Sequence, residues 1–127
     1  MAVKFLSTDW ADAVKARLNA NDAFRQAAAG HRARIQQVIS DGAGETRYWI
    51  EIADGRIDMG LGDADDPDAT ISESYETAVK LATSELSVVT AFMTGKVKVA
   101  GNMGLLMSLQ GALSQLPAAM QEIETDY

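Results

Sequence analysis

The chain contains no cysteine, one histidine and two prolines in 127 residues. Without cysteine it has no disulfide, no thiolate metal site and no thiol nucleophile. Its hydrophobic content of 47% is too high for a disordered protein, and its length fits one ordinary domain. We therefore expect residues 1–127 to form a single packed domain.

Positive charge is scarce in the second half of the chain. Residues 1–62 carry eight basic and eight acidic side chains, whereas residues 63–127 carry three basic and ten acidic ones, so the net charge of −7 lies entirely in the second half. Such a surface repels phosphate backbones, and we expect no nucleic-acid partner. The charge mainly favours solubility.

Long apolar runs are also missing. Residues 7–9, Ser-Thr-Asp, interrupt the apolar start too early for a secretory signal. Residues 99–121 are 23 consecutive uncharged residues, enough to span a bilayer, but they include Asn102, Gln110 and Gln115. We predict a cytoplasmic protein without stable membrane insertion, in which this run is partly hidden from water.

The common catalytic and ion-binding motifs are absent from the sequence. His31 is the only histidine, and no serine stands in a G-x-S-x-G turn, so no acyl-transfer triad is predicted. A phosphate loop would need glycine at Thr90 and Ser or Thr at Val97. The acidic loop 63–68 lacks the glycine of a calcium loop, because Asp68 stands there. We predict no metal and no cofactor.

The first half of the chain predicts two helices and a three-stranded meander. Residues 7–9 cap a helix that ends near Asn19, and Asn21-Asp22 caps a second helix over 23–29, which stops at Gly30. Alternating patterns then predict strands over 33–39, 47–53 and 56–61, and Asp54-Gly55 joins the last two. In the middle strand Tyr48, Ile50 and Ile52 point one way, and Trp49, Glu51 and Ala53 point the other way.

The second half predicts two more strands and several helices. Residues 69–71 predict a short fourth strand, Ser72 caps the helix that follows, and residues 88–93 form another helix. A fifth strand over 96–99 leads to final helices that Asn102 caps, with Pro117 at a kink or in the first turn of a separate segment. We predict an α+β fold in which helices pack on a mixed five-stranded sheet.

The last helical stretch has an unusually broad apolar surface. At helical spacing, one seam contains Leu106, Leu109, Leu113, Leu116, Met120 and Ile123. In its first two turns Leu105, Met103 and Met107 widen the apolar arc to roughly 200° of the wheel, about twice what packing on one sheet requires. Two interpretations stay open, because neighbouring helices could bury this surface or it could cover a cavity for an apolar ligand.

Two sequence stretches form a recognisable motif, DATISESY at residues 68–75 and AFMTGKVKVAGNMGLLMSL at residues 91–109. They resemble the sterol carrier protein type two family. The resemblance implies a five-stranded sheet covered on one face by helices around an apolar tunnel for sterols, fatty acids, fatty acyl-CoA or phospholipids. We assign the motif residues Gly101 and Gly104 to backbone geometry and Asn102 to capping.

The leading hypothesis is a non-enzymatic carrier that holds one hydrophobic lipid between the sheet and the last helical stretch. The side chains expected to contact the ligand are Trp49, Phe92, Met93, Met103, Leu106, Met107, Leu109 and Leu113. The alternative is an interaction module of the same fold, for example a homodimer formed through the apolar helix. A third hypothesis is an enzyme that uses Glu51 or Asp58, and it predicts a solvent-reachable polar pocket at the hairpin.

Overall fold

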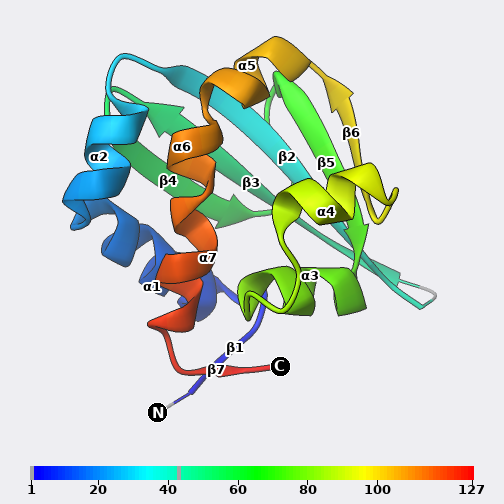
Figure 1. Ribbon diagram of the computed structural model, residues 1–127. Coiled ribbons are helices and arrows are strands. Elements are labelled where there is room, and N and C mark those ends of the chain that lie inside the picture. The colour runs from blue at the N-terminus through cyan, green and yellow to red at the C-terminus, as the bar shows by residue number, and fades with distance from the viewer. Residues whose placement is uncertain (1, 43) are drawn as a thin grey trace.

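The fold is a five-stranded sheet with helices packed on one face (Figure 1). The computed structural model describes residues 2–42 and 44–127. The helices are α1 (Thr8–Asn19), α2 (Asp22–Ala28), α3 (Tyr75–Ala82), α4 (Val88–Met93), α5 (Met103–Ser108), α6 (Gln110–Leu113) and α7 (Gln115–Gln121). The strands are β1 (Val3–Lys4), β2 (Arg32–Asp41), β3 (Gly44–Ala53), β4 (Arg56–Leu61), β5 (Ala69–Ser74), β6 (Val97–Gly101) and β7 (Thr125–Asp126).

The large sheet is mixed, as predicted. Its strand order is β4-β3-β2-β5-β6. Neighbouring strands are antiparallel except β2 and β5, which are parallel. The β3–β4 turn has positive φ at both Asp54 (52°) and Gly55 (83°), which is the geometry of a two-residue hairpin turn. The predicted meander and its turn are therefore confirmed.

One face of the sheet, called the inner face below, points toward the helices. Tyr48 of β3 identifies it, because its ring meets Trp10 of α1 edge-on with centroids 5.4 Å apart. Side chains alternate along each strand, so the cross-strand register assigns the other members. The inner face includes Ala33, Ile35, Gln37, Ile39, Thr46, Tyr48, Ile50, Ile52, Ile57, Met59, Leu61, Ala69, Ile71, Glu73, Val97 and Val99.

Helices α1 and α2 begin where the sequence predicts them. The Ser7 hydroxyl accepts a hydrogen bond from the Trp10 amide, and the Asn21 side chain accepts one from the Phe24 amide. Helix α1 is held to the sheet edge at Ile57 of β4, whose backbone N–H and C=O both bond to the Asn19 side chain at 2.9 and 3.0 Å. These contacts fix the N-terminal helices over β4, β3 and β2.

The predicted end of the fourth strand is wrong by three residues. Strand β5 continues through Ser74, because Ser72, Glu73 and Ser74 stay in the ladder with β2. Ser74, rather than Ser72, caps α3, and its hydroxyl accepts from the Thr77 amide at 3.1 Å. Glu73 therefore lies on the inner face of the sheet and not in the first turn of a helix.

The C-terminal stretch forms three short helices, in agreement with the predicted final helices and separate segment at Pro117. Asn102 caps α5 as predicted, accepting from the Leu105 amide at 3.0 Å. Leu109 separates α5 from α6, and Ser114 separates α6 from α7. Pro117 lies in the first turn of α7. The predicted seam is largely buried at Leu106, Leu109, Leu116 and Met120.

A second, two-stranded sheet joins the two ends of the chain, and the sequence pattern did not predict it. Strands β1 and β7 pair in parallel, with the Val3 amide donating to the Glu124 carbonyl and the Phe5 amide to the Asp126 carbonyl at 2.9 and 3.0 Å. Figure 1 shows this pair below α7 and α3. Among the helices described, none has the length and apolar character needed to cross a membrane.

Candidate functional site

The helices cover one half of the inner face tightly. On β2 and β3, Ile35, Ile39, Ile50 and Ile52 are at most 1% exposed. These side chains belong to a continuous apolar cluster with residues of α1 and α2, among them Trp10. Because these side chains are almost completely buried, this half of the sheet is an ordinary packed core.

The cover is incomplete over the other half, formed by β5 and β6. Ile71, Glu73 and Val99 point to the inner face and yet remain part exposed. Two helices flank these strands along the chain, because α4 ends shortly before β6 begins and α5 starts shortly after β6 ends. Figure 1 shows α4 and α5 at opposite ends of the β5–β6 pair. On these strands Ile71, Glu73 and Val99 are therefore less covered than the apolar inner-face residues of β2 and β3, although Ala69 and Val97 are buried.

Large apolar side chains are exposed on the same two helices. Phe92 and Met93 of α4 are 45% and 80% exposed, and Met103 and Met107 of α5 are 39% and 71% exposed. We call these four side chains the apolar rim. Phe92 and Met93 lie on α4, and Met103 and Met107 lie on α5. Exposed apolar side chains that are contiguous on a surface are typical of sites that bind lipids or proteins.

The residues predicted to contact a ligand fall into three groups. Phe92, Met93, Met103 and Met107 form the rim, and the structure brings them to helices that flank β5 and β6. Leu106 and Leu109 are buried against the core, whereas Leu113 is only partly buried beside it. Seven of the eight predicted contacts therefore belong to the helical layer on the inner face.

Trp49 is not brought together with the other seven. It follows Tyr48 in β3 and so points to the opposite, outer face of the sheet. There it covers Gly60 on β4, because a Cβ placed on Gly60 would lie only 2.6 Å from the Trp49 ring. The predicted alternation had already separated Trp49 from Ile50, and the structure follows that pattern.

A polar group on the inner face was missed by the prediction. Gln37 of β2 is 7% exposed, and the register places Tyr48 directly opposite it on β3. On the other side Gln37 pairs with Ile71, and Glu73 lies two residues further along β5. Within the described part of the chain, Gln37 Oε1 and Glu73 Oε2 are buried without a hydrogen-bond partner.

Burial changes the acidity of this polar group. It raises the pKa of the Glu73 carboxyl to about 7, since a charged carboxylate is poorly solvated there. Burial, with a smaller contribution from the nearby Glu73 charge, raises the pKa of the Tyr48 hydroxyl above its usual range. Near pH 7 the Tyr48 hydroxyl is therefore neutral, and the Glu73 carboxyl is divided between its protonated and its charged form.

The polar group of Gln37 and Glu73 was not predicted from the sequence, for a different reason at each residue. Gln37 stands among Ala33, Ile35 and Ile39 in the predicted strand, so a polar side chain in an apolar row was visible but not interpreted. Glu73 was hidden by the assignment of Ser72 as a helix cap. A charged residue at an inner-face position argues against a strand on pattern alone, and only the pairing with β2 and β6 reveals it.

The hairpin does have the polar depression that the catalytic hypothesis predicts. It measures about 360 Å³, and its lining includes Glu51 and Asp58, which face each other across β3 and β4. Each carboxylate is engaged by a cation, Glu51 by Arg34 at 3.0 Å and Asp58 by Lys15 at 3.3 Å. All four partners are substantially exposed, which is the arrangement of a surface ion-pair network.

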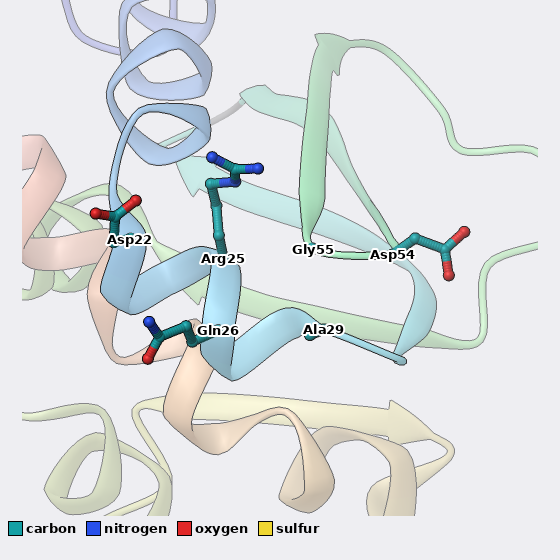
Figure 2. Close-up of a pocket in the computed structure, with 6 residues that line it drawn as sticks. All are labelled: Asp22, Arg25, Gln26, Ala29, Asp54 and Gly55. Atoms are coloured by element: carbon teal, nitrogen blue, oxygen red, sulfur yellow. The ribbon is translucent and has the colours of Figure 1, made fainter.

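A second surface depression, of about 380 Å³, lies between α2 and the β3–β4 turn (Figure 2). Asp22, Arg25 and Gln26 approach it from the helix, and Asp54 and Gly55 form its other side. In Figure 2 the Asp54 carboxylate points away from α2, and it bonds to Arg32 at 3.0 Å. This lining is too polar for the apolar ligand that the motif resemblance implies.

Comparison with known proteins identifies the family. The sequence model of the SCP-2 sterol transfer family matches residues 11–114. The chain belongs to the SCP-2 sterol transfer family. The predicted resemblance is therefore confirmed, and the match also covers the meander and most of α1.

Two relatives of this SCP-2 family chain are much longer proteins. Hydroxysteroid dehydrogenase-like protein 2 of Xenopus tropicalis is 28% identical over 87 residues, which are 68% of this chain and 21% of the relative. Sterol carrier protein 2 of Gallus gallus is 32% identical over 74 residues, which are 57% of this chain and 14% of the relative. The chain thus spans about a fifth or less of each.

A solved structure agrees with the fold. The crystal structure of sterol carrier protein 2 superposes with a TM-score of 0.81 at 20% sequence identity, covering 94% of this chain and 99% of that one. At this identity the likeness concerns the fold alone. It confirms the predicted α+β architecture of a mixed five-stranded sheet with helices on one face.

Proposed function

We propose that this SCP-2 family chain binds a hydrophobic lipid and carries it without catalysing a reaction. The ligand would lie on the inner face of β5 and β6, between α4 and α5. One observation supports this location above the others. Ile71 and Val99 are apolar inner-face residues that remain part exposed, although the apolar inner-face residues of β2 and β3 are buried.

The side chains around this location suit a flexible apolar ligand. The proposed contacts are the rim residues Phe92, Met93, Met103 and Met107, together with Leu106, Leu109 and Leu113. Each methylene that leaves water contributes about 0.8 kcal/mol, so a long chain is held without any specific polar contact. Methionine side chains repack easily around different shapes. Sterols, fatty acids, fatty acyl-CoA and phospholipids are the candidate ligands.

Lipid extraction provides the direct test. Organic extraction of the purified chain, with native mass spectrometry of the intact protein, should find a lipid bound in a one-to-one ratio. After delipidation, a fluorescent long-chain alcohol and a fluorescent fatty acid should bind with saturation. If extraction yields no lipid and neither probe binds, the proposal is wrong.

The apolar rim supports a second candidate, an interaction module. Met93 and Met107 are more exposed than is usual for large apolar side chains, and a homodimer formed through α4 and α5 would cover them. Light scattering over a range of concentrations distinguishes the two candidates. A strict monomer at all concentrations, with no captured partner, removes this one.

The non-enzymatic assignment is supported by the ion pairs at the hairpin. Glu51 and Asp58 are held by Arg34 and Lys15, so neither is poised as a free acid or base. Location in the cytoplasm stays a prediction from the sequence, and fluorescence microscopy of a tagged chain tests it.

A further inference from the structure

Two polar side chains on the inner face need a partner that the protein does not supply. Gln37 Oε1 and Glu73 Oε2 are both buried, and neither accepts a hydrogen bond from any described residue. Folded proteins satisfy most buried polar atoms, and each exception calls for an explanation. Two of the three such atoms among the described residues, those of Gln37 and Glu73, lie on the adjacent strands β2 and β5, where the covered half of the sheet meets the incompletely covered half. The third is Trp10 Nε1 of α1.

The register shows that these two side chains belong to one site. Gln37 pairs with Ile71, and Glu73 follows two residues later on the same face of β5. Such diagonal neighbours have Cα atoms roughly 7 to 8 Å apart, within reach of two long side chains that point the same way. Tyr48 lies across from Gln37 and is close enough to Glu73 to sense its charge. The three residues form a polar patch inside an apolar surface.

The chemistry of the patch selects a hydrogen-bond donor. The unpartnered atoms of Gln37 and Glu73 are oxygen acceptors, and a hydroxyl group, which has one proton to donate, can satisfy one of them at a time. A fatty-acid carboxylate has no proton to donate and would add a second negative charge beside Glu73. An ester has no charge but also no donor, so it would leave both oxygens unsatisfied.

The position of the patch also orients the ligand. Glu73 pairs with Val97 near the end of α4, whereas Ala69, at the other end of β5, pairs with Gly101 just before α5. Glu73 and Ala69 are four residues apart, or about 13 Å along an extended strand. A chain anchored at Glu73 would therefore pass Ile71 and Val99 and reach α5 near Met103.

We infer that Gln37 and Glu73 form an acceptor site that selects long-chain lipids with a hydroxyl head group over fatty-acid carboxylates, with the head group bound inside. The inference rests on the proposed lipid-binding function and specifies its ligand class. Gln37 and Glu73 are specificity-determining residues in this arrangement, while the apolar rim supplies contact with the chain.

Competition with a fluorescent long-chain alcohol at pH 8 tests the preference for a hydroxyl head group. The competitors are 1-hexadecanol, 1-monopalmitoylglycerol, palmitate and methyl palmitate, which share one chain length and differ in the head group. For the wild-type chain we expect hexadecanol to bind at least about tenfold more tightly than palmitate and methyl palmitate, the effect of one charge-assisted hydrogen bond. Monopalmitoylglycerol reports whether the site also accepts a glycerol hydroxyl.

Two variants test whether Gln37 and Glu73 cause the preference for a hydroxyl head group. Glu73→Gln keeps the shape but removes the charge, so the ratio between hexadecanol and palmitate should fall to about threefold or less. Gln37→Leu should weaken hexadecanol binding and leave methyl palmitate binding unchanged. Glu76→Gln is the matched control, because Glu76 is an exposed residue of α3 paired with Lys80 at 3.3 Å, and it should preserve the wild-type ratio.

The outcomes separate the two proposals. Equal binding of all four ligands to the wild-type chain would overturn the head-group preference and leave lipid binding intact. A preference that survives in both Glu73→Gln and Gln37→Leu would show that another site reads the head group and would also overturn the inference. If no ligand displaces the probe and the probe itself fails to bind, the proposed function is wrong.

Discussion

Gln37 and Glu73 lie on the same face of two adjacent parallel strands, two residues apart in register. Both point into a surface otherwise made of apolar side chains, and both keep an oxygen without a partner among the described residues. The sheet of this SCP-2 family chain therefore has a polar position under an apolar helical layer. We expect this polar position to affect the free energy of unfolding, its dependence on pH, and the preference among ligand head groups.

The free energy of unfolding should depend on pH through Glu73. Its pKa is about 7 in the folded chain and near 4.5 when unfolded, so between these values the folded chain holds a proton that the unfolded chain has released. The resulting stabilisation is complete below pH 4.5, falls as the pH rises, and is lost above pH 7. The shift corresponds to about 3 kcal/mol. Urea denaturation from pH 4.5 to 8 measures it.

Glu73→Gln supplies the comparison for this pH dependence. The variant cannot titrate at this position, so the difference in stability between it and the wild-type chain should grow by about 3 kcal/mol in favour of the variant from pH 4.5 to 8. Other groups titrate equally in both chains and cancel. A constant difference across this range would contradict the assignment.

Ser74→Ala should destabilise the chain more than Ser72→Ala. The Ser74 hydroxyl caps α3 by accepting from the Thr77 amide, and loss of such a cap costs about 1 kcal/mol. Ser72 lies within β5 opposite Val38 and caps no helix. Thermal denaturation of both variants checks the corrected helix start. Equal losses would argue for the boundary that the sequence pattern predicted.

Two glycines of the shared motif should respond in opposite ways to alanine. At Gly101 φ is +102°, and an added Cβ would lie 2.6 Å from the Asp68 carbonyl oxygen, so Gly101→Ala should cost about 3 kcal/mol. At Gly104 the nearest atom would be 3.6 Å away, and alanine favours the helix by up to about 1 kcal/mol. Chemical denaturation of both variants tests the assignment to backbone geometry. A tolerated Gly101→Ala would refute it.

Met107→Asp should weaken lipid binding without unfolding the chain. Met107 is exposed, so the free energy of unfolding should change by less than about 0.5 kcal/mol. A charge in the apolar rim removes a contact with the ligand chain, and we expect at least about a tenfold rise in Kd for the fluorescent alcohol. Leu61→Asp is the control, because Leu61 is an exposed apolar residue on the edge strand β4. A similar loss in both variants would exclude a specific role of the rim.

Local patterns predicted most of the fold correctly. The caps at Ser7, Asn21 and Asn102, and the Asp54-Gly55 turn, depend on interactions within a few residues, which the sequence displays directly. The length of β5 depends instead on pairing with β2 and β6, which are distant in the chain. For this reason the end of the strand, and Glu73 with it, could not be placed from the local pattern.

The candidate site was predicted only in its apolar part. Broad apolar spacing identified Met103 and Met107 of α5 as unusual, and both are exposed. The pattern could not reveal which inner-face positions remain uncovered, because that depends on where separate helices meet the sheet. Gln37 and Glu73, which are 36 residues apart in sequence, become one site only through the register of β2 and β5.

The parallel pair of β1 and β7 has a consequence for protein engineering. Val3 pairs with Thr125, so the first and last strands lie one strand spacing apart, about 5 Å, and because they are parallel the chain enters and leaves the pair at opposite ends (Figure 1). Insertion of the domain into a surface loop of a host enzyme therefore needs a linker that runs back along this pair. The same linker would permit a circular permutant opened in the exposed acidic turn near Asp66, with β5 and β6 left uncut.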